Sequence, residues 1–329
     1  MTSFTSRRVL VTGAGGFIGS HLVETLLRDG ADVRAFVRYN SRNDSGLLDL
    51  LAPESLAEVD VVPGDIRNGE AVADAVDRCE VVFHLAALIA VPYSYRNPRD
   101  YFETNVLGTL NVAQACRSRD VRLVHTSTSE VYGTARSVPI SEAHPVVGQS
   151  PYSASKIGAD HLVESFHRSY ALPATILRPF NTYGPRQSAR AIIPTIAAQA
   201  LAGDVVRLGA LAPTRDFTYV EDIVAGFLAA AVADAAIGRT LQLGTGVEIS
   251  IGDLVHAVER VLGRELRVEH AEERLRPAES EVMRLVSDHS HMTAVTGWEP
   301  RVGFDAGLAA TIAWIEEHSD LYRVDRYVV

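Results

Sequence analysis

A short apolar run followed at once by a glycine-rich loop is the feature that most restricts the fold of this 329-residue chain. The run Val9-Leu10-Val11-Thr12 is typical of a buried strand, and Gly13-Ala14-Gly15-Gly16-Phe17-Ile18-Gly19 follows it and opens a helical pattern. This order places free backbone N–H groups at the start of a helix, where they attract negative charge. Gly13 permits the tight turn, Gly16 the close approach of a phosphate, and Gly19 the close packing of helix on strand. We therefore predict that a dinucleotide pyrophosphate binds at Gly13, Gly16, Phe17, Ile18 and Gly19.

Strands and helices alternate along the first half of the chain. After the first strand, apolar runs occur at residues 33–37, 59–62, 81–85, 122–126 and 174–178, with helical patterns between them. This alternation predicts an α/β fold of the Rossmann type, a doubly wound parallel sheet covered by helices on both faces. A smaller, mostly helical C-terminal lobe is expected to bind the substrate. We place the dinucleotide-binding domain at residues 1–180 plus about 213–245, and the substrate lobe at 181–212 and 246–329.

Composition argues against several classes of function. Lys and Arg number 31 and Asp and Glu number 41, so the net charge is −10 and nucleic-acid binding is not expected. No run approaches the 18 apolar residues of a membrane span, and the polar N-terminus lacks the apolar stretch of a signal peptide. Cys79 and Cys116 are too few for a disulfide framework, and no His/Cys cluster has the spacing of a metal site. We expect a cytoplasmic protein with no membrane partner and no metal.

The end of the second predicted strand bears on the choice of cofactor. NAD sites usually place an acid there to hold the ribose 2′-hydroxyl, but this strand ends in residues 37–42, Val-Arg-Tyr-Asn-Ser-Arg. Arg38 and Arg42 could pair with a 2′-phosphate, which favours NADP; both could also be solvated surface residues, and NAD stays open. Further cofactor contacts are expected from Asp65 and Ile66 at the adenine and from the small residues Leu85, Ala86 and Ala87 after the fourth strand.

Tyr152 and Lys156 lie one helical turn apart in the run Tyr-Ser-Ala-Ser-Lys, on one face of a predicted helix. The Lys156 ammonium can lower the pKa of Tyr152 and hold the nicotinamide ribose, so that a tyrosinate accepts a proton from a sugar hydroxyl. Thr128 ends an earlier strand, and its hydroxyl can bond the same substrate oxygen. Together with the glycine loop, these residues predict hydride-transfer chemistry.

With these motifs, the chain resembles the extended short-chain dehydrogenases/reductases of the nucleotide-sugar epimerase/dehydratase group. The resemblance runs from about Val9 to Trp314 and includes the segments at residues 178–185 (Arg-Pro-Phe-Asn-Thr-Tyr-Gly-Pro), 215–222 (Arg-Asp-Phe-Thr-Tyr-Val-Glu-Asp) and 297–300 (Gly-Trp-Glu-Pro). It implies that Asn181, Arg215 and Arg276 hold the diphosphate of a nucleotide sugar. It also implies a homodimer with a four-helix interface, built from the helices near 101–117 and 153–170. Arg190 could contact the phosphate or nucleotide, or equally lie at the surface.

Glu130 points to one reaction within this group. The stretch 128–133, Thr-Ser-Glu-Val-Tyr-Gly, carries an acid two residues beyond Thr128, where similar 4-epimerases typically have none. A 4,6-dehydratase needs such a base to remove the C5 proton once C4 is a ketone. In the deoxythymidine-glucose dehydratases the middle residue is Asp; here Ser129 resembles the mannose dehydratases, so Glu130 could act as both base and acid.

The sugar substrate follows from a second resemblance. Residues 139–152 and 178–194 are similar to N-acetylglucosamine-type 4,6-dehydratases of legionaminic-acid pathways, which act on UDP- or GDP-linked N-acetylglucosamine. Three alternatives stay open: a UDP-glucuronate decarboxylase, a nucleotide-sugar 4-epimerase, and a non-catalytic dinucleotide sensor on the same fold.

Overall fold

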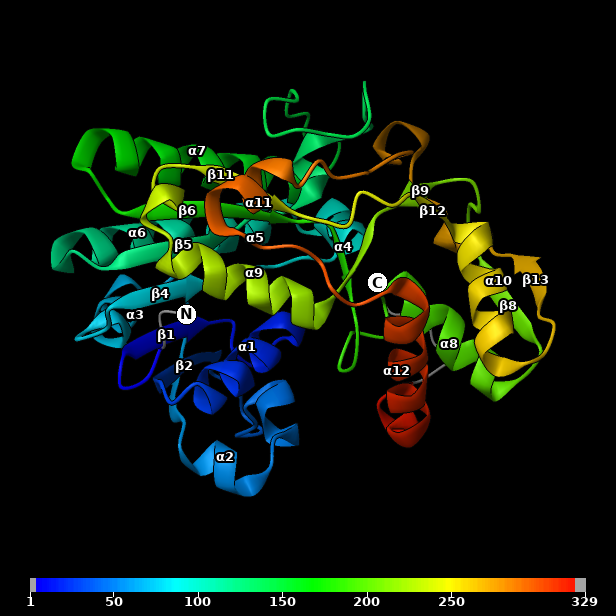
Figure 1. The fold of residues 1–329 in the computed structure, drawn as a ribbon, viewed down its shortest axis with the longest axis horizontal. Coiled ribbons are helices and arrows are strands. Elements are labelled where there is room, and N and C mark those ends of the chain that lie inside the picture. Colours follow the sequence, from blue (N-terminus) through cyan, green and yellow to red (C-terminus); the bar gives the residue numbers. More distant parts are fainter. Residues whose placement is uncertain (1–3, 323–329) are drawn as a thin grey trace.

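The computed structural model describes residues 4–322. Its centre is a seven-stranded sheet in the order β11-β6-β5-β4-β1-β2-β3 (Figure 1), and every neighbouring pair is parallel. The strands are β1 (Arg8–Thr12), β2 (Asp32–Arg38), β3 (Asp60–Gly64), β4 (Val81–His84), β5 (Arg122–Thr126), β6 (Ala174–Pro179) and β11 (Thr240–Leu243). The predicted Rossmann-type fold is confirmed, and the carboxyl ends of these strands meet at one edge of the sheet.

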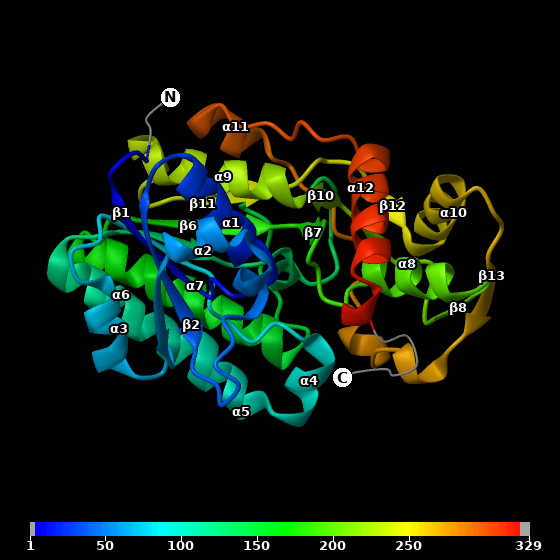
Figure 2. The same cartoon turned by 90° about the horizontal axis from the view of Figure 1, so that it is seen from below.

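Helices cover both faces of this sheet (Figures 1 and 2). One face carries α1 (Phe17–Arg28), α9 (Val220–Val232) and α11 (Ser290–Thr296); the other carries α3 (Gly69–Val76), α6 (Gly108–Arg119) and α7 (Pro151–Tyr170). Successive residues of β1 point to opposite faces, so Val9 and Val11 join the first core and Leu10 joins the second. Both cores are fully buried, which is why the strands read as continuous apolar runs.

A second group of elements packs around a core of its own, to the right in Figure 1. It contains α8 (Ile192–Ala202), α10 (Ile251–Leu262), α12 (Phe304–Glu317) and three small two-stranded sheets. These sheets pair β7 (Asn181–Tyr183) with β10 (Phe217–Tyr219), β9 (Thr214–Arg215) with β12 (Ile249–Ser250), and β8 (Val205–Leu208) with β13 (Arg267–His270). The chain enters this group after β6 and returns to the large sheet through α9 and β11.

Short helical segments complete the described chain. They are α2 (Pro53–Ala57), α4 (Val91–Arg96), α5 (Pro98–Tyr101), a π-helical turn (Phe102–Leu107) and the 3₁₀ turns η1 (Gly46–Leu50), η3 (Ser129–Tyr132), η4 (Asp234–Ala236), η5 (Glu272–Arg274), η6 (Ala278–Ser280) and η7 (Ser319–Leu321). The helix expected near residues 101–117 is present, and the π-helical turn at Phe102–Leu107 runs directly into α6.

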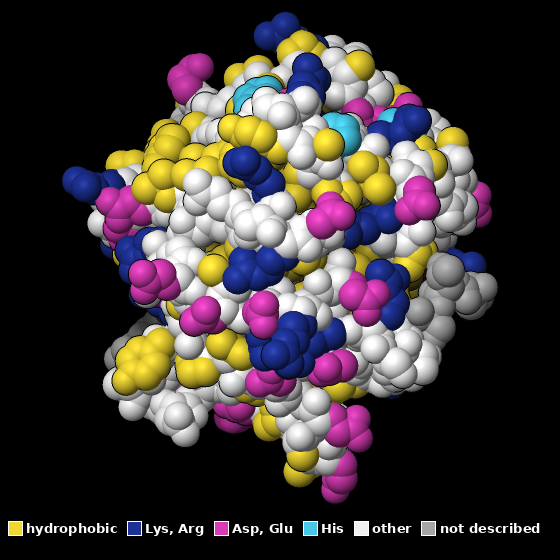
Figure 3. Space-filling model, turned by 90° about the vertical axis from the view of Figure 1, so that its left-hand side faces the viewer, with side chains coloured by type: hydrophobic (Ala, Val, Ile, Leu, Met, Phe, Trp, Pro, Cys, Tyr) yellow, Lys and Arg dark blue, Asp and Glu magenta, His cyan; other side chains and the backbone are white. Residues whose placement is uncertain are grey.

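The charged side chains are dispersed on the face drawn in Figure 3, where Lys and Arg are interspersed with Asp and Glu. Within residues 4–322, no helix combines the length and apolar character that a membrane span requires.

Candidate active site

A cavity of about 670 Å³ opens at the carboxyl edge of the sheet, between the sheet and the second group of elements. Its walls come from the glycine loop, the segment after β2, the loop after β4, the end of β5, helix α7 and the segment after β6. Of the residues predicted for the site, the lining includes Gly13, Gly16, Phe17, Ile18, Gly19, Arg38, Leu85, Ala86, Ala87, Thr128, Ser129, Glu130, Tyr152, Lys156, Asn181, Arg190 and Arg276. Segments far apart in sequence thus face one space, as expected at the edge of a doubly wound sheet.

At the glycines that the predicted cofactor site requires, the loop has no room for a side chain. Gly13 has φ +71°, and a Cβ there would lie 2.7 Å from the backbone nitrogen of Ala86. A Cβ on Gly19 would lie 2.3 Å from the carbonyl oxygen of Gly13. Helix α1 begins after Gly16 with no side-chain cap and no acid in its first turn, so its N–H groups and dipole remain available to an anion. These features fit the pyrophosphate of a dinucleotide.

Gly19→Ala is expected to weaken cofactor binding at least tenfold and to destabilise the fold by about 1–3 kcal/mol, because the added methyl must push the turn away from α1. Isothermal titration with NAD and NADP and thermal unfolding measure the two effects. Gly203→Ala is the matched control, since a Cβ at Gly203 meets nothing within 4 Å. Equal cofactor affinity in both variants would contradict the prediction.

The adenosine end of the cavity differs in part from the sequence prediction. Arg38 lines it, whereas the Arg42 side chain is 82% exposed and pairs with Asp44 at 2.8 Å. Asp65 and Ile66 do not line the cavity: Asp65 is held by Arg67 at 2.6 Å, which lowers the pKa of Asp65, and Ile66 is buried against Gly108. Sequence reasoning missed Asp44, which lines the cavity because the loop after β2 folds back onto the glycine loop; the turn-forming run Asn-Asp-Ser-Gly at residues 43–46 was the available signal.

Tyr152 and Lys156 come together with Thr128 because α7 begins beside the end of β5. Helix α7 starts with a capping box between Ser150 and Ser153 and a proline at its first turn, which fixes where Tyr152 stands. The Thr128 side chain hydrogen-bonds Tyr152, and Lys156 Nζ donates to the Thr126 carbonyl oxygen at 2.5 Å. All three groups face the cavity.

The predicted lowering of the Tyr152 pKa by Lys156 is wrong for this arrangement. Burial raises the pKa of Tyr152, and the hydrogen bond with Thr128 only partly opposes that shift. Burial also lowers the pKa of Lys156 to about 8, against the opposing charge of Asp160. The spacing of Tyr152 and Lys156 in the sequence predicts that both lie on one helix face, but it does not indicate how deeply they are buried.

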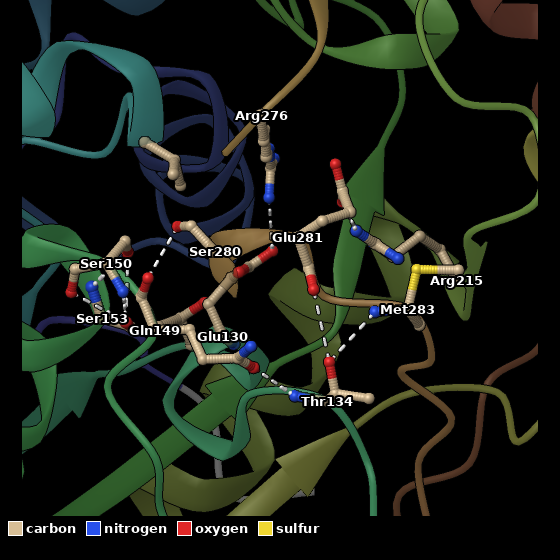
Figure 4. A network of polar contacts seen from close by, with 12 residues as sticks. Glu130, Thr134, Gln149, Ser150, Ser153, Arg215, Arg276, Ser280, Glu281 and Met283 are labelled. Carbon is tan, nitrogen blue, oxygen red and sulfur yellow. Dashed lines mark hydrogen bonds and ion pairs between the residues drawn. The ribbon is translucent and has the colours of Figure 1, made fainter. Parts of the chain in front are cut away.

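Two arginines and two glutamates meet at the other end of the cavity (Figure 4). Arg276 Nη1 lies 3.8 Å from Glu130 Oε1, and Arg215 Nη2 donates to Glu281 Oε1 at 3.5 Å. Arg276 and Glu130 line the cavity, while Arg215 is 6% exposed and lies behind the lining. The two positive and two negative charges cancel. Each arginine is held in place by a glutamate but is only weakly paired with it, so both guanidinium groups can bind an incoming dianion.

Of the other predicted substrate contacts, Asn181 lines the cavity with a buried Oδ1 that has no hydrogen-bond partner, so this atom can accept from a ligand. Arg190 lines the cavity from an exposed position on the segment before α8. Among the described residues no group of three or more His, Cys, Asp or Glu side chains is arranged to hold a metal ion.

Burial lowers the pKa of several histidines in this structure. His125 is fully buried beside Asp160, and burial together with the Lys156 charge lowers the pKa of His125 to about 4; burial likewise lowers the pKa of His21 to about 4. The unfolded chain, with a histidine pKa near 6.5, binds more protons than the folded chain between about pH 6.5 and pH 4. Folding stability is therefore full above pH 6.5 and is lost as the pH falls through this window.

We expect His125 alone to account for about 2 kcal/mol of lost stability at pH 5. Urea unfolding at pH 7 and pH 5 measures this, and His125→Asn should flatten the pH dependence by that amount. His161→Asn, at a side chain that is 62% exposed, should leave the pH dependence unchanged. An equally steep pH dependence in His125→Asn would contradict the expectation.

Comparison with known proteins identifies the family. Residues 10–311 match the family model described as GDP-mannose 4,6 dehydratase, which is most of the chain. The chain belongs to the nucleotide-sugar epimerase/dehydratase group of the extended short-chain dehydrogenases/reductases.

Relatives of this epimerase/dehydratase protein include both reaction types. A UDP-glucose 4-epimerase of Mycolicibacterium smegmatis is 34% identical over 95% of this chain and 99% of its own length. A dTDP-glucose 4,6-dehydratase of the same organism is 33% identical over 96% and 95%. The solved structure of DesIV, a dTDP-glucose 4,6-dehydratase from Streptomyces venezuelae with NAD and TYD bound, has a TM-score of 0.84 and 30% identity and covers 96% of this chain and 99% of that one. The family resemblance inferred from the sequence is confirmed.

Proposed function

We propose that this protein is a nucleotide-sugar 4,6-dehydratase that acts on UDP- or GDP-linked N-acetylglucosamine. The observation that supports it most is Glu130: it lines the same cavity as Thr128 and Tyr152, and Arg276 stands 3.8 Å from its carboxylate. A carboxylate beside the C4-oxidising residues is what removal of a C5 proton requires. Dehydratases among the relatives support the reaction type.

The cofactor we propose is a tightly bound nicotinamide dinucleotide, held by the glycine loop, by Leu85, Ala86 and Ala87, and by Lys156. When bound it would accept hydride from C4 and return it to C6. Arg38 supports NADP, whereas the Asp44 carboxylate and the NAD bound in DesIV support NAD. Mass spectrometry of the cofactor released by denaturing the purified protein distinguishes the two.

The chemistry of the chain's own groups follows from their positions. Tyr152, hydrogen-bonded to Thr128, takes the proton of the sugar 4-hydroxyl, and the bond from Thr128 is the contact that favours its tyrosinate form. Glu130 then removes the C5 proton, and the 6-hydroxyl leaves as water with a proton that Glu130, beside Ser129, returns to it. With hydride returned to C6, C5 takes up a proton that balances the one Tyr152 received from the 4-hydroxyl, and the product is a 4-keto-6-deoxy nucleotide sugar.

The second candidate is a 4-epimerase, favoured by the relative that is 34% identical. Incubation with UDP- and GDP-N-acetylglucosamine, and separately with UDP-glucose, dTDP-glucose and UDP-glucuronate, followed by mass spectrometry, separates the reactions. We expect loss of one water from an N-acetylglucosamine nucleotide. A product of unchanged mass would establish the epimerase instead, and CO₂ release from UDP-glucuronate the decarboxylase. A wild type without any of these activities would support the dinucleotide sensor.

The proposal extends to the assembly. Helices α6 and α7 of two copies would form the four-helix interface of a homodimer, and exposed Phe102 and Leu107, in the π turn before α6, support an apolar contact there. Light scattering on a sizing column measures the mass.

Two further expectations remain predictions. One is the division into a dinucleotide-binding part at 1–180 plus about 213–245 and a nucleotide-sugar lobe at 181–212 and 246–329. The other is the cytoplasmic location.

A further inference from the structure

Residues 276–283, which we call the strap, bring Arg276 to the cavity opposite Glu130 (Figure 4). The strap contains the 3₁₀ turn η6 and is held to elements far away in the sequence. Ser280, 8% exposed, bonds the hydroxyl of Tyr95 in α4 at 2.6 Å. The position of Arg276 therefore depends on these anchoring contacts as well as on the strap's own fold.

Gln149 makes the most of these contacts. Its side-chain Nε2 donates to the Glu279 carbonyl oxygen at 3.0 Å, and its main-chain carbonyl oxygen accepts from Ser280 Oγ at 2.6 Å. Its Oε1 accepts from the backbone N–H of Thr134. Gln149 also immediately precedes Ser150, the residue that caps α7 and so places Tyr152. The Gln149 side chain thus joins the strap to the turn after Glu130, and the main chain of the same residue joins the strap to the start of the catalytic helix.

The turn after Glu130 is shaped to receive this side chain. Gly133 has φ +63°, and a Cβ on it would lie 2.4 Å from Gln149 Oε1. The Gly133 N–H donates to the Glu130 carbonyl oxygen at 3.3 Å, so the turn that meets Gln149 is the one that carries the proposed base. Thr134 adds a second link, because its hydroxyl donates to the Glu281 carbonyl oxygen at 3.4 Å and accepts from the Met283 N–H at 3.3 Å.

We propose that Gln149 is a positioning residue that holds the strap, and with it Arg276, in register with Glu130 and Tyr152. The inference rests on the proposed function in one respect, the binding of a substrate diphosphate by Arg276. Without the Gln149 side chain, the strap keeps its bond to Tyr95, its Thr134 link and the bond from Ser280 to the main chain of residue 149. It loses the hydrogen bond from Gln149 Nε2 to the Glu279 carbonyl oxygen, and with it the side chain that ties the strap to the Thr134 N–H. The reacting groups then stay in the cavity, but their distance from Arg276, the proposed phosphate contact, is no longer fixed.

The test uses Gln149→Ala and the near-isosteric Gln149→Glu. The glutamate variant keeps the acceptor for the Thr134 N–H but sets a carboxylate against the Glu279 carbonyl, and its similar shape protects the fold. Isothermal titration with UDP, GDP and dTDP gives the affinity for whichever the wild type binds most tightly. We expect both variants to lose about tenfold in this affinity, since the hydrogen bond that holds Glu279 of the strap to the Gln149 side chain is lost. With the active nucleotide sugar, KM should rise by about the same factor and kcat fall less than about threefold, with cofactor affinity unchanged.

Gln199→Ala is the matched control. Gln199 is half-buried and also ties a helix to a neighbouring segment, donating to the Thr195 carbonyl oxygen at 3.0 Å and accepting from the Arg207 N–H at 2.9 Å. Like Gln149 it does not line the cavity, but these two partners lie outside the strap. It should lose stability without losing nucleotide affinity. Wild-type affinity in both Gln149 variants, or an equal loss in Gln199→Ala, would overturn the role of Gln149. A wild type that binds none of the three diphosphates would instead refute the diphosphate site, and the role with it, whereas binding without dehydration would refute only the reaction.

Discussion

Glu130→Gln is expected to reduce water loss from the nucleotide sugar by 10²- to 10⁴-fold while leaving C4 oxidation intact. The glutamine amide keeps the shape of the side chain and cannot take the C5 proton. Tyr152 and Lys156 stand on α7 and Thr128 caps the turn η3 just after β5, so we expect C4 oxidation not to depend on Glu130. The reduced nicotinamide should therefore accumulate on the enzyme, visible by its absorbance, without a dehydrated product in the mass spectrum.

The control for this experiment is Glu248→Gln. Glu248 pairs with Arg284 at 2.6 Å and lies outside the cavity lining, so its replacement removes a carboxylate and an ion pair without touching the site. It should dehydrate at the wild-type rate. Undiminished dehydration by Glu130→Gln would show that Glu130 is not the base, and loss of both oxidation and dehydration would assign it a role in binding.

Asp160→Ala is expected to cost about 3–5 kcal/mol of folding stability, the largest stability effect we predict. Asp160 is 1% exposed and accepts hydrogen bonds from Ser127 Oγ at 2.8 Å and from the Nη2 and Nε atoms of Arg178 at 2.9 and 3.1 Å. Its charge is also close enough to oppose the lowering of the Lys156 pKa. Removing it leaves the buried Arg178 guanidinium uncompensated and further disfavours a charged Lys156.

Urea unfolding monitored by circular dichroism measures this loss. Asp234→Ala is the comparison, because Asp234 also pairs with an arginine, Arg122, at 3.1 Å but has a side chain that is 95% exposed. Exposed pairs contribute about 0–1 kcal/mol, so this variant should stay close to wild type. A loss in Asp160→Ala no greater than that in Asp234→Ala would mean that water or another group replaces the carboxylate.

Local patterns carried most of the fold prediction. The run from Val9 to Gly19 predicted a strand, turn and helix because each depends on neighbours within a few residues, and the structure contains β1, the turn and α1 there. The spacing of Tyr152 and Lys156 predicted one helix face for the same reason. The π-helical turn within the helix expected near 101–117 was not predicted, because the apolar pattern continues across it.

The adenosine end was less predictable. Asp65 follows a strand, as the expected adenine contact should, but Arg67 holds its carboxylate outside the cavity. Asp44 reaches the cavity because the Leu47 N–H donates to the Gly15 carbonyl oxygen and draws the intervening loop against the glycine turn. Both outcomes depend on contacts between loops, for which hydrophobic periodicity gives no signal.

The sequence by itself determined the parallel sheet, the glycine loop and the helix face that carries Tyr152 and Lys156. Helical and strand periodicities act over a few residues, so they can be recognised without the tertiary structure. Only the tertiary structure decided which charges face each other. Arg276 meets Glu130, and Gln149 joins the strap to the start of α7, across long separations in the chain. Burial was also decided there: it raises the pKa of Tyr152 and lowers that of Lys156, since desolvation depends on everything packed around a group rather than on its sequence neighbours.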